Sequence, residues 1–106
     1  MVENVSLNDF VEAVATGGCS VVDVRERAEY VSGHVPGAEH IPLHIVPLRV
    51  SDIPSGERSF VICESGARAW QAATLLESRG VSVRNVEGGM AAWRSAALAF
   101  VRGESA

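Results

Sequence analysis

The chain has 106 residues, of which 47% are hydrophobic, and its 13 acidic and 9 basic side chains give a formal charge of −4. This length fits a single domain over residues 1–106, and the composition excludes a disordered or low-complexity chain. The acidic balance without a basic cluster argues against nucleic acid and membrane surfaces as partners, and the lack of lysine excludes lysine-based covalent catalysis.

The N-terminal part of the chain predicts a helix followed by a strand. Ser6 is a suitable N-cap for a helix over residues 7–16, in which apolar residues recur at helical spacing. The β-branched run at 20–24 then predicts a buried strand. Charged residues follow it abruptly, which is typical of a parallel strand whose C-terminal end reaches the surface, with Asp23 and Arg25 at that edge.

The segment after this strand is less regular. A short helical turn over residues 26–31 and a glycine- and proline-rich turn at 33–37 precede a brief strand at 39–41, which Pro42 ends. Residues 43–50 fit neither the helical nor the strand period, so their conformation stays open.

The second half of the chain repeats the order of strand, turn and helix. Residues 59–62 predict a buried strand, 67–79 a helix, 81–86 a further strand, and the double glycine at 88–89 the turn before a last helix. Repeated strand–helix units predict an α/β fold, an open and mostly parallel sheet of about five strands with helices on both faces.

The run from Cys63 to Arg68 joins a predicted strand to a predicted helix and is the candidate site. Open parallel sheets bind ligands beyond the C-terminal ends of their strands, which is where this run lies. With Gly66 at positive φ, backbone amides could converge on the Cys63 sulfur, and the following helix would add the positive end of its dipole. Such surroundings favour a nucleophilic thiolate, and the planar cation of Arg68 suits an anionic substrate.

The alternative for a single cysteine at a strand end is a small buried hydrophobic residue. Gly66 and Arg68, three and five positions after Cys63, favour the site over that alternative. Cys19 lies at the opposite end of its strand and is assigned to packing. Trp70 and Trp93 lie on apolar helix faces and are expected in the core.

The Cys63–Arg68 run resembles the active-site loop of the rhodanese family, in which a cysteine precedes Ser/Thr-Gly-x-Arg. Two further segments resemble family motifs, an upstream one over residues 22–38 and a C-terminal one over 87–93. Together the three motifs cover most of the chain. The resemblance is to a single-domain rhodanese, with a rhodanese-like fold.

The resemblance implies a sulfurtransferase in which Cys63 takes a sulfane sulfur from thiosulfate or a thiol-borne persulfide. The resulting persulfide passes the sulfur to a thiol, to cyanide or to a protein acceptor. Arg68 is then expected to bind the oxyanion of the donor, and no cofactor is needed because the cysteine carries the sulfur. The implied substrate-binding residues are those that supply the loop amides, Glu64, Ser65, Gly66, Ala67 and Arg68.

Two departures from the family pattern carry expectations of their own. Glu64 stands where many members have a cation or a neutral residue, and an acid there opposes a thiolate and repels a dianion. We therefore expect weak use of thiosulfate and better use of a less charged donor. Residues 96–99 replace a frequent Gly-Leu-Pro ending, so the last helix is expected to run on through them.

Other functions remain as alternatives. A non-catalytic module that docks a partner or carries sulfur is one, although docking alone does not require Cys63, Gly66 and Arg68 together. A phosphatase or arsenate reductase is another, but the cell-cycle phosphatases place one more residue between cysteine and arginine than the four found here. The shorter loop suits a single sulfur atom better than a tetrahedral oxyanion.

The remaining polar residues are interpreted as structural. His34, His40 and His44 do not fall at a convincing ligand spacing, so no metal site is expected. Asp23, Arg25, Glu26 and Glu29 are interpreted as making local ion pairs and capping the next helical turn rather than as forming an acid/base site.

Targeting signals are not apparent in the sequence. The longest apolar run, residues 96–101, is far shorter than the roughly 20 residues that cross a bilayer. Glu3 stands where a secretory signal has basic residues. We therefore expect a cytoplasmic protein in which Cys19 and Cys63 are free thiols.

Overall fold

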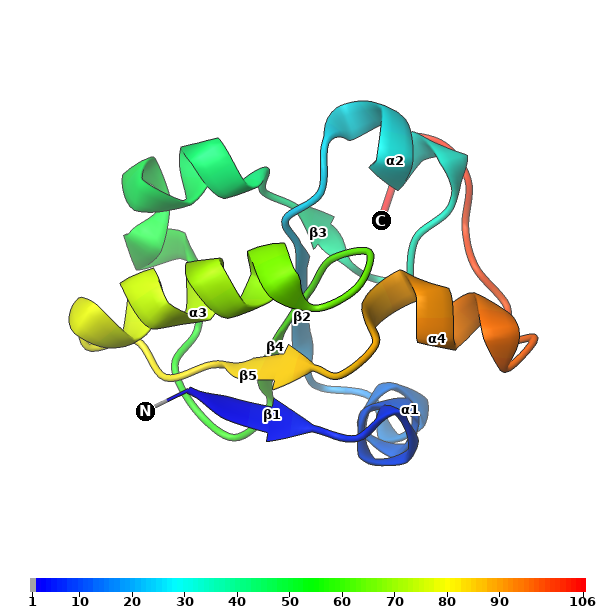
Figure 1. The fold of residues 1–106 in the computed structure, drawn as a ribbon, viewed down its shortest axis with the longest axis horizontal. Helices are drawn as coiled ribbons and strands as arrows, with labels where there is room; N and C mark the ends of the chain where they lie inside the picture. The colour runs from blue at the N-terminus through cyan, green and yellow to red at the C-terminus, as the bar shows by residue number, and fades with distance from the viewer. Residues whose placement is uncertain (1) are drawn as a thin grey trace.

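The computed structural model describes residues 2–106 and contains one open sheet of parallel strands (Figure 1). Its five strands are β1 (Glu3–Val5), β2 (Ser20–Asp23), β3 (Glu39–His40), β4 (Ser59–Ile62) and β5 (Arg84–Val86). Their order in the sheet is β1-β5-β4-β2-β3, and all neighbouring pairs run parallel. The predicted α/β fold with a parallel sheet is therefore confirmed.

Helices cover both faces of the sheet. On one face lie α3 (Ala67–Ser78) and the two 3₁₀ helices η1 (Leu43–Leu48) and η2 (Val50–Asp52). On the other lie α1 (Leu7–Thr16), α2 (Arg27–Ser32) and α4 (Gly89–Ser95).

Successive side chains of the central strand β4 point to opposite faces of the sheet, and each face has its own apolar core. Val61 belongs to the core beneath α3, and Ile62 to the core beneath α1 and α4. Both side chains are fully buried, because helices cover the two sides of the strand. The continuous apolar run that predicted this strand therefore reflects a position in the middle of the sheet.

The regular elements largely match the sequence expectations. The predicted helix 7–16 and the strand 59–62 are found at those bounds, and Ser6 accepts a hydrogen bond from the Asp9 amide as the N-cap of α1. Strand β1 was not predicted, because it has three residues, lies at the edge of the sheet and contains no apolar run. The open segment 43–50 is mostly 3₁₀ helix, whose period of three residues per turn fits neither pattern.

Two expectations about the C-terminal half are wrong. The last helix does not continue through residues 96–99: it ends at Ser95, and Ala97 adopts a positive φ of 57°. The chain reverses there, and the reversal places the carbonyl of Ala99 where the Trp93 indole N–H donates to it at 3.0 Å. Trp93 is buried as expected, but Trp70 on α3 is 49% exposed and is not a core residue.

The C-terminal segment returns alongside α2 (Figure 1). Val101 and His34 exchange two backbone hydrogen bonds of 2.9 Å, and the amide of Gly103 donates to the carbonyl of Val31. His34 is fully buried beneath this segment and donates from Nδ1 to the carbonyl of Tyr30 at 2.8 Å. Within residues 2–106, no helix is both long enough and apolar enough to cross a membrane.

Candidate active site

Cys63 directly follows β4 at the C-terminal edge of the sheet. Its side chain is 1% exposed and packs against the core beneath α3. The amide of Gly66 donates to the Cys63 Sγ at a donor–acceptor distance of 3.0 Å. Gly66 has the predicted positive φ, at 109°, and the helix α3 begins at the next residue.

The backbone of the loop gives this sulfur a polar side as well as an apolar one. The first N–H groups of an α-helix have no carbonyl partner within the helix. Those of Ala67 and Arg68 belong to this first turn of α3. Among the described residues, Gly66 is the loop residue whose amide donates to the Cys63 sulfur. It stays a prediction that the other four amides of residues 64–68 also bind a transferred sulfur atom.

The N-terminus of α4 holds the backbone of the loop in place. The amides of Met90 and Ala91 donate to the carbonyls of Cys63 and Glu64, at 2.8 and 3.0 Å. Such a close approach requires a glycine: a Cβ on Gly89 would lie 2.3 Å from the Cys63 carbonyl oxygen. Sequence reasoning took the double glycine as a turn, and it missed that the second glycine contacts the cysteine loop.

Arg68 is held by a residue of α2. Its Nη1 and Nη2 atoms donate to the two carboxylate oxygens of Glu29 at 2.7 and 2.9 Å. This paired hydrogen bond lowers the pKa of Glu29 to about 2 and raises the pKa of Arg68 above its usual value. The predicted oxyanion ligand is therefore already bound to a carboxylate, and its contact with a substrate stays a prediction.

The side chain of Glu64 lies between two arginines. Its Oε1 atom is 3.4 Å from Nη1 of Arg25, and its Oε2 atom accepts a hydrogen bond from Nη2 of Arg94. Arg25 is 1% exposed, and it binds Asp23 through Nε and Nη2 and the Gly33 carbonyl through Nη2. Asp23 and Arg25 form a local ion pair of the kind expected for the charges after β2. The link from Arg25 to the cysteine loop was missed, because no local spacing encodes it.

A cavity of about 210 Å³ opens beside the loop, between α2, α4 and the C-terminal segment. Its charged lining comes from Arg25, Glu29, Glu64 and Arg94, and its apolar lining includes Phe100. Glu64 is the residue of the loop 63–68 that lines this cavity, whereas Cys63 and Arg68 do not line it.

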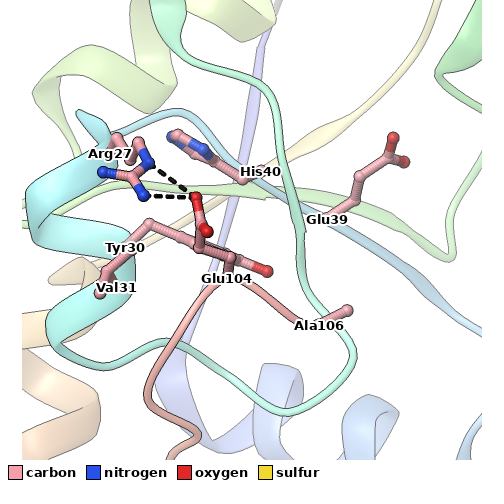
Figure 2. Close-up of a pocket in the computed structure, with 7 residues that line it drawn as sticks. All are labelled: Arg27, Tyr30, Val31, Glu39, His40, Glu104 and Ala106. Carbon is pink, nitrogen blue, oxygen red and sulfur yellow. Dashed lines mark hydrogen bonds and ion pairs between the residues drawn. The ribbon is translucent and has the colours of Figure 1, made fainter.

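A second cavity, of about 350 Å³, lies apart from the loop, and none of residues 63–68 lines it. Figure 2 shows the ion pair of Arg27 and Glu104 in this cavity, with Tyr30 and His40 on its wall. His40 stacks on Tyr30 and donates from Nε2 to the carbonyl of Arg25 at 2.7 Å. In residues 2–106, no three His, Cys, Asp or Glu side chains are grouped so as to hold a metal ion.

Substitution of Gly89 tests the close approach of α4 to the loop. We expect Gly89→Ala to lower the free energy of unfolding by about 2–4 kcal/mol, because its Cβ overlaps backbone atoms and its φ of 52° disfavours alanine. The matched control is Gly80→Ala, which has a similarly positive φ of 81° but no atom within 4 Å of the added Cβ. The control is expected to lose about 1 kcal/mol in urea denaturation. Equal losses in the two variants would contradict the contact.

The Glu29–Arg68 pair predicts a pH-dependent contribution to stability. The pKa of Glu29 is lowered from 4.5 to about 2 on folding, so its stabilisation is complete above pH 4.5 and is lost as the pH falls towards 2. At pH 6 we expect Glu29→Gln to be about 1 kcal/mol less stable than the wild type. In urea denaturation at pH 3 the difference should be smaller. A difference that does not change with pH would contradict the pair.

Comparison with known proteins agrees with the fold. A model of the rhodanese-like domain matches residues 6–96. The chain is 39% identical over 85 residues to a sulfurtransferase of Allochromatium vinosum, with 79% of each chain covered. It is 35% identical over 94 residues, 87% of its length, to the putative sulfur carrier protein YrkF of Bacillus subtilis, and spans 51% of that protein.

The solved structures give the same result. A rhodanese-like domain protein from Staphylococcus aureus matches with a TM-score of 0.80 and 28% identity, over 87% of this chain and 91% of that one. The match of the family model to most of the chain confirms the expectation drawn from the three motifs. The chain belongs to the rhodanese-like domain family.

Proposed function

We propose that this domain is a sulfurtransferase that carries a sulfane sulfur on Cys63. The observation that supports the proposal best is the 3.0 Å hydrogen bond from the Gly66 amide to the Cys63 sulfur. It lies at the start of α3, where the helix dipole and unpartnered amides stabilise negative charge. Backbone amides of this kind would stabilise both the Cys63 thiolate and the persulfide anion formed from it.

The first proposed step loads the cysteine. The Cys63 thiolate attacks the outer sulfur of thiosulfate, the S–S bond of thiosulfate breaks, and sulfite leaves with the bonding electron pair. The cysteine becomes a persulfide anion, Cys–S–S⁻. The charge of the reactants, one thiolate and one dianion, equals that of the products, and no proton or external oxidant is needed. A thiol-borne persulfide would load Cys63 in the same way, with a thiolate as the leaving group.

The second proposed step unloads it. A thiolate acceptor attacks the terminal sulfur of the persulfide, the S–S bond to Cys63 breaks, and the cysteine thiolate is restored. The acceptor leaves as its own persulfide, and cyanide would leave as thiocyanate. We propose that the amides of residues 64–68 hold the terminal sulfur between the two steps, and that Arg68 guides an anionic donor by sharing its guanidinium between Glu29 and the donor.

A second candidate function is that of a sulfur carrier within a relay, without multiple turnover of small substrates. The observation that favours it is the 35% identity to a protein named as a putative sulfur carrier. The two functions share the persulfide on Cys63 and differ in the acceptor. Turnover of thiosulfate with cyanide or a small thiol supports the enzyme, whereas loading of Cys63 without such turnover supports the carrier.

Intact-mass spectrometry tests the proposal. Incubation with thiosulfate or an organic persulfide should add about 32 Da to the protein, and dithiothreitol should remove the added mass. We expect Cys63→Ser to abolish this gain. Cys19→Ser serves as the matched control and should still be loaded, because Cys19 lies at the far end of β2. Loading of the Cys63→Ser variant, or no loading of the wild type by any donor, would contradict the proposal.

A further inference from the structure

Glu64 occupies the position beside the loop where an anionic substrate would find two arginines. Its carboxylate contacts Arg94 and lies 3.4 Å from the buried Arg25, and all three side chains line the 210 Å³ cavity. The Nη1 atom of Arg25 faces Glu64, whereas its Nε and Nη2 atoms are engaged by Asp23 and Gly33. The Glu64 carboxylate thus binds guanidinium N–H groups of two arginines that line the cavity.

The charges around the cavity cancel in pairs. Asp23 balances Arg25, and Glu64 balances Arg94. On the α2 side, Glu29 balances Arg68. A cavity with balanced charges has little attraction for a dianion, even though three arginines surround the loop. Neutralising Glu64 would leave the charge of Arg94 uncompensated on the cavity wall, where its side chain is 41% exposed.

We propose that Glu64 determines donor specificity by acting as an internal anion that occupies Arg94. A dianionic donor such as thiosulfate must displace the carboxylate from this arginine, whereas an uncharged donor of sulfane sulfur does not need the cation. The expected effect of Glu64 on thiosulfate turnover rests on the proposed function. The expected effect on anion binding does not, because a carboxylate bound to Arg94 affects anion binding whether or not sulfur is transferred.

This mechanism differs from the simple repulsion expected from the sequence. Repulsion by Glu64 acts on the donor directly, so removing the charge would help a dianion by the same factor whether or not Arg94 is present. Occupation acts mainly through Arg94, so most of the benefit of removing the Glu64 charge disappears when Arg94 is also removed. Arg25 remains near the freed position, but Asp23 already balances its charge. A double-mutant cycle separates the two mechanisms.

The binding experiment uses the Cys63→Ser background, in which no sulfur is transferred. Isothermal titration calorimetry at low ionic strength measures the Kd of thiosulfate for this protein and for its Glu64→Gln, Arg94→Gln and doubly substituted forms. Glutamine keeps the shape of Glu64, and the backbone bond from Ala91 to its carbonyl does not involve the side chain. Near-ultraviolet circular dichroism verifies that each form is folded.

We expect Glu64→Gln to tighten thiosulfate binding about tenfold, and the same change to alter the Kd less than about twofold when Arg94 is glutamine. The tenfold gain should shrink as salt is added, because Arg94 is partly exposed. An equal gain in both backgrounds, or no gain in either, would overturn the inference.

Turnover provides the second readout. With Cys63 intact, Glu64→Gln should lower the KM for thiosulfate by a larger factor than it changes kcat. The KM for an alkyl persulfide, which carries at most one negative charge and loads Cys63 with an alkyl thiolate as the leaving group, should change much less. An equal change for both donors would also overturn the inference. If Cys63 is never loaded but the binding cycle behaves as expected, the proposed sulfur transfer fails and the role of Glu64 in anion binding stands.

Discussion

The close approach of α4 to the backbone of Cys63 and Glu64 is the constraint on which the site depends. Two amides at the start of α4 bind the carbonyls of these residues, and the lack of a side chain at Gly89 makes the approach sterically feasible. With its start fixed by α4, the loop turns at Gly66, whose amide points back to the sulfur. The third family motif is therefore part of the architecture of the candidate site, although it is separated in sequence from the cysteine.

The electrostatics of the site follow from paired charges rather than from an excess of cations. Asp23, Glu29 and Glu64 each neutralise an arginine close to the loop. The contact with the sulfur itself comes from a backbone amide, that of Gly66. Fixed amide dipoles need no counter-ion and do not titrate, so in the proposed function they stabilise an anionic sulfur while the side chains around them affect which donor binds.

The sequence was sufficient to predict those features that local patterns determine. The Ser6 cap and the helical spacing after it gave the bounds of α1, and the apolar run 59–62 gave β4, because burial on both faces leaves a continuous hydrophobic signature. The positive φ of Gly66 was also predictable, since a turn of this kind favours glycine. The chain reversal at Ala97 was not, because alanine is normally a good helix former.

The partners of the loop residues could not be predicted from spacing. Arg68 and Glu29 are 39 positions apart, and Arg94 and Glu64 are 30 apart, so each pair depends on how the helices pack on the sheet. As a result, Glu64 was singled out as a departure from the family pattern, but was expected to act by its own charge alone. The structure shows that this charge is shared with two arginines, and that Arg68, the expected oxyanion ligand, already has a carboxylate partner.

The central claim is that backbone amides of the cysteine loop hold the transferred sulfur. It is tested most directly by ¹H–¹⁵N NMR spectra of the same sample before loading with a sulfane donor, after loading, and after reduction. The account predicts that the amide resonances of residues 64–68 shift on loading and return when dithiothreitol removes the sulfur. Unchanged resonances of these five residues in a sample whose mass shows a loaded Cys63 would contradict it.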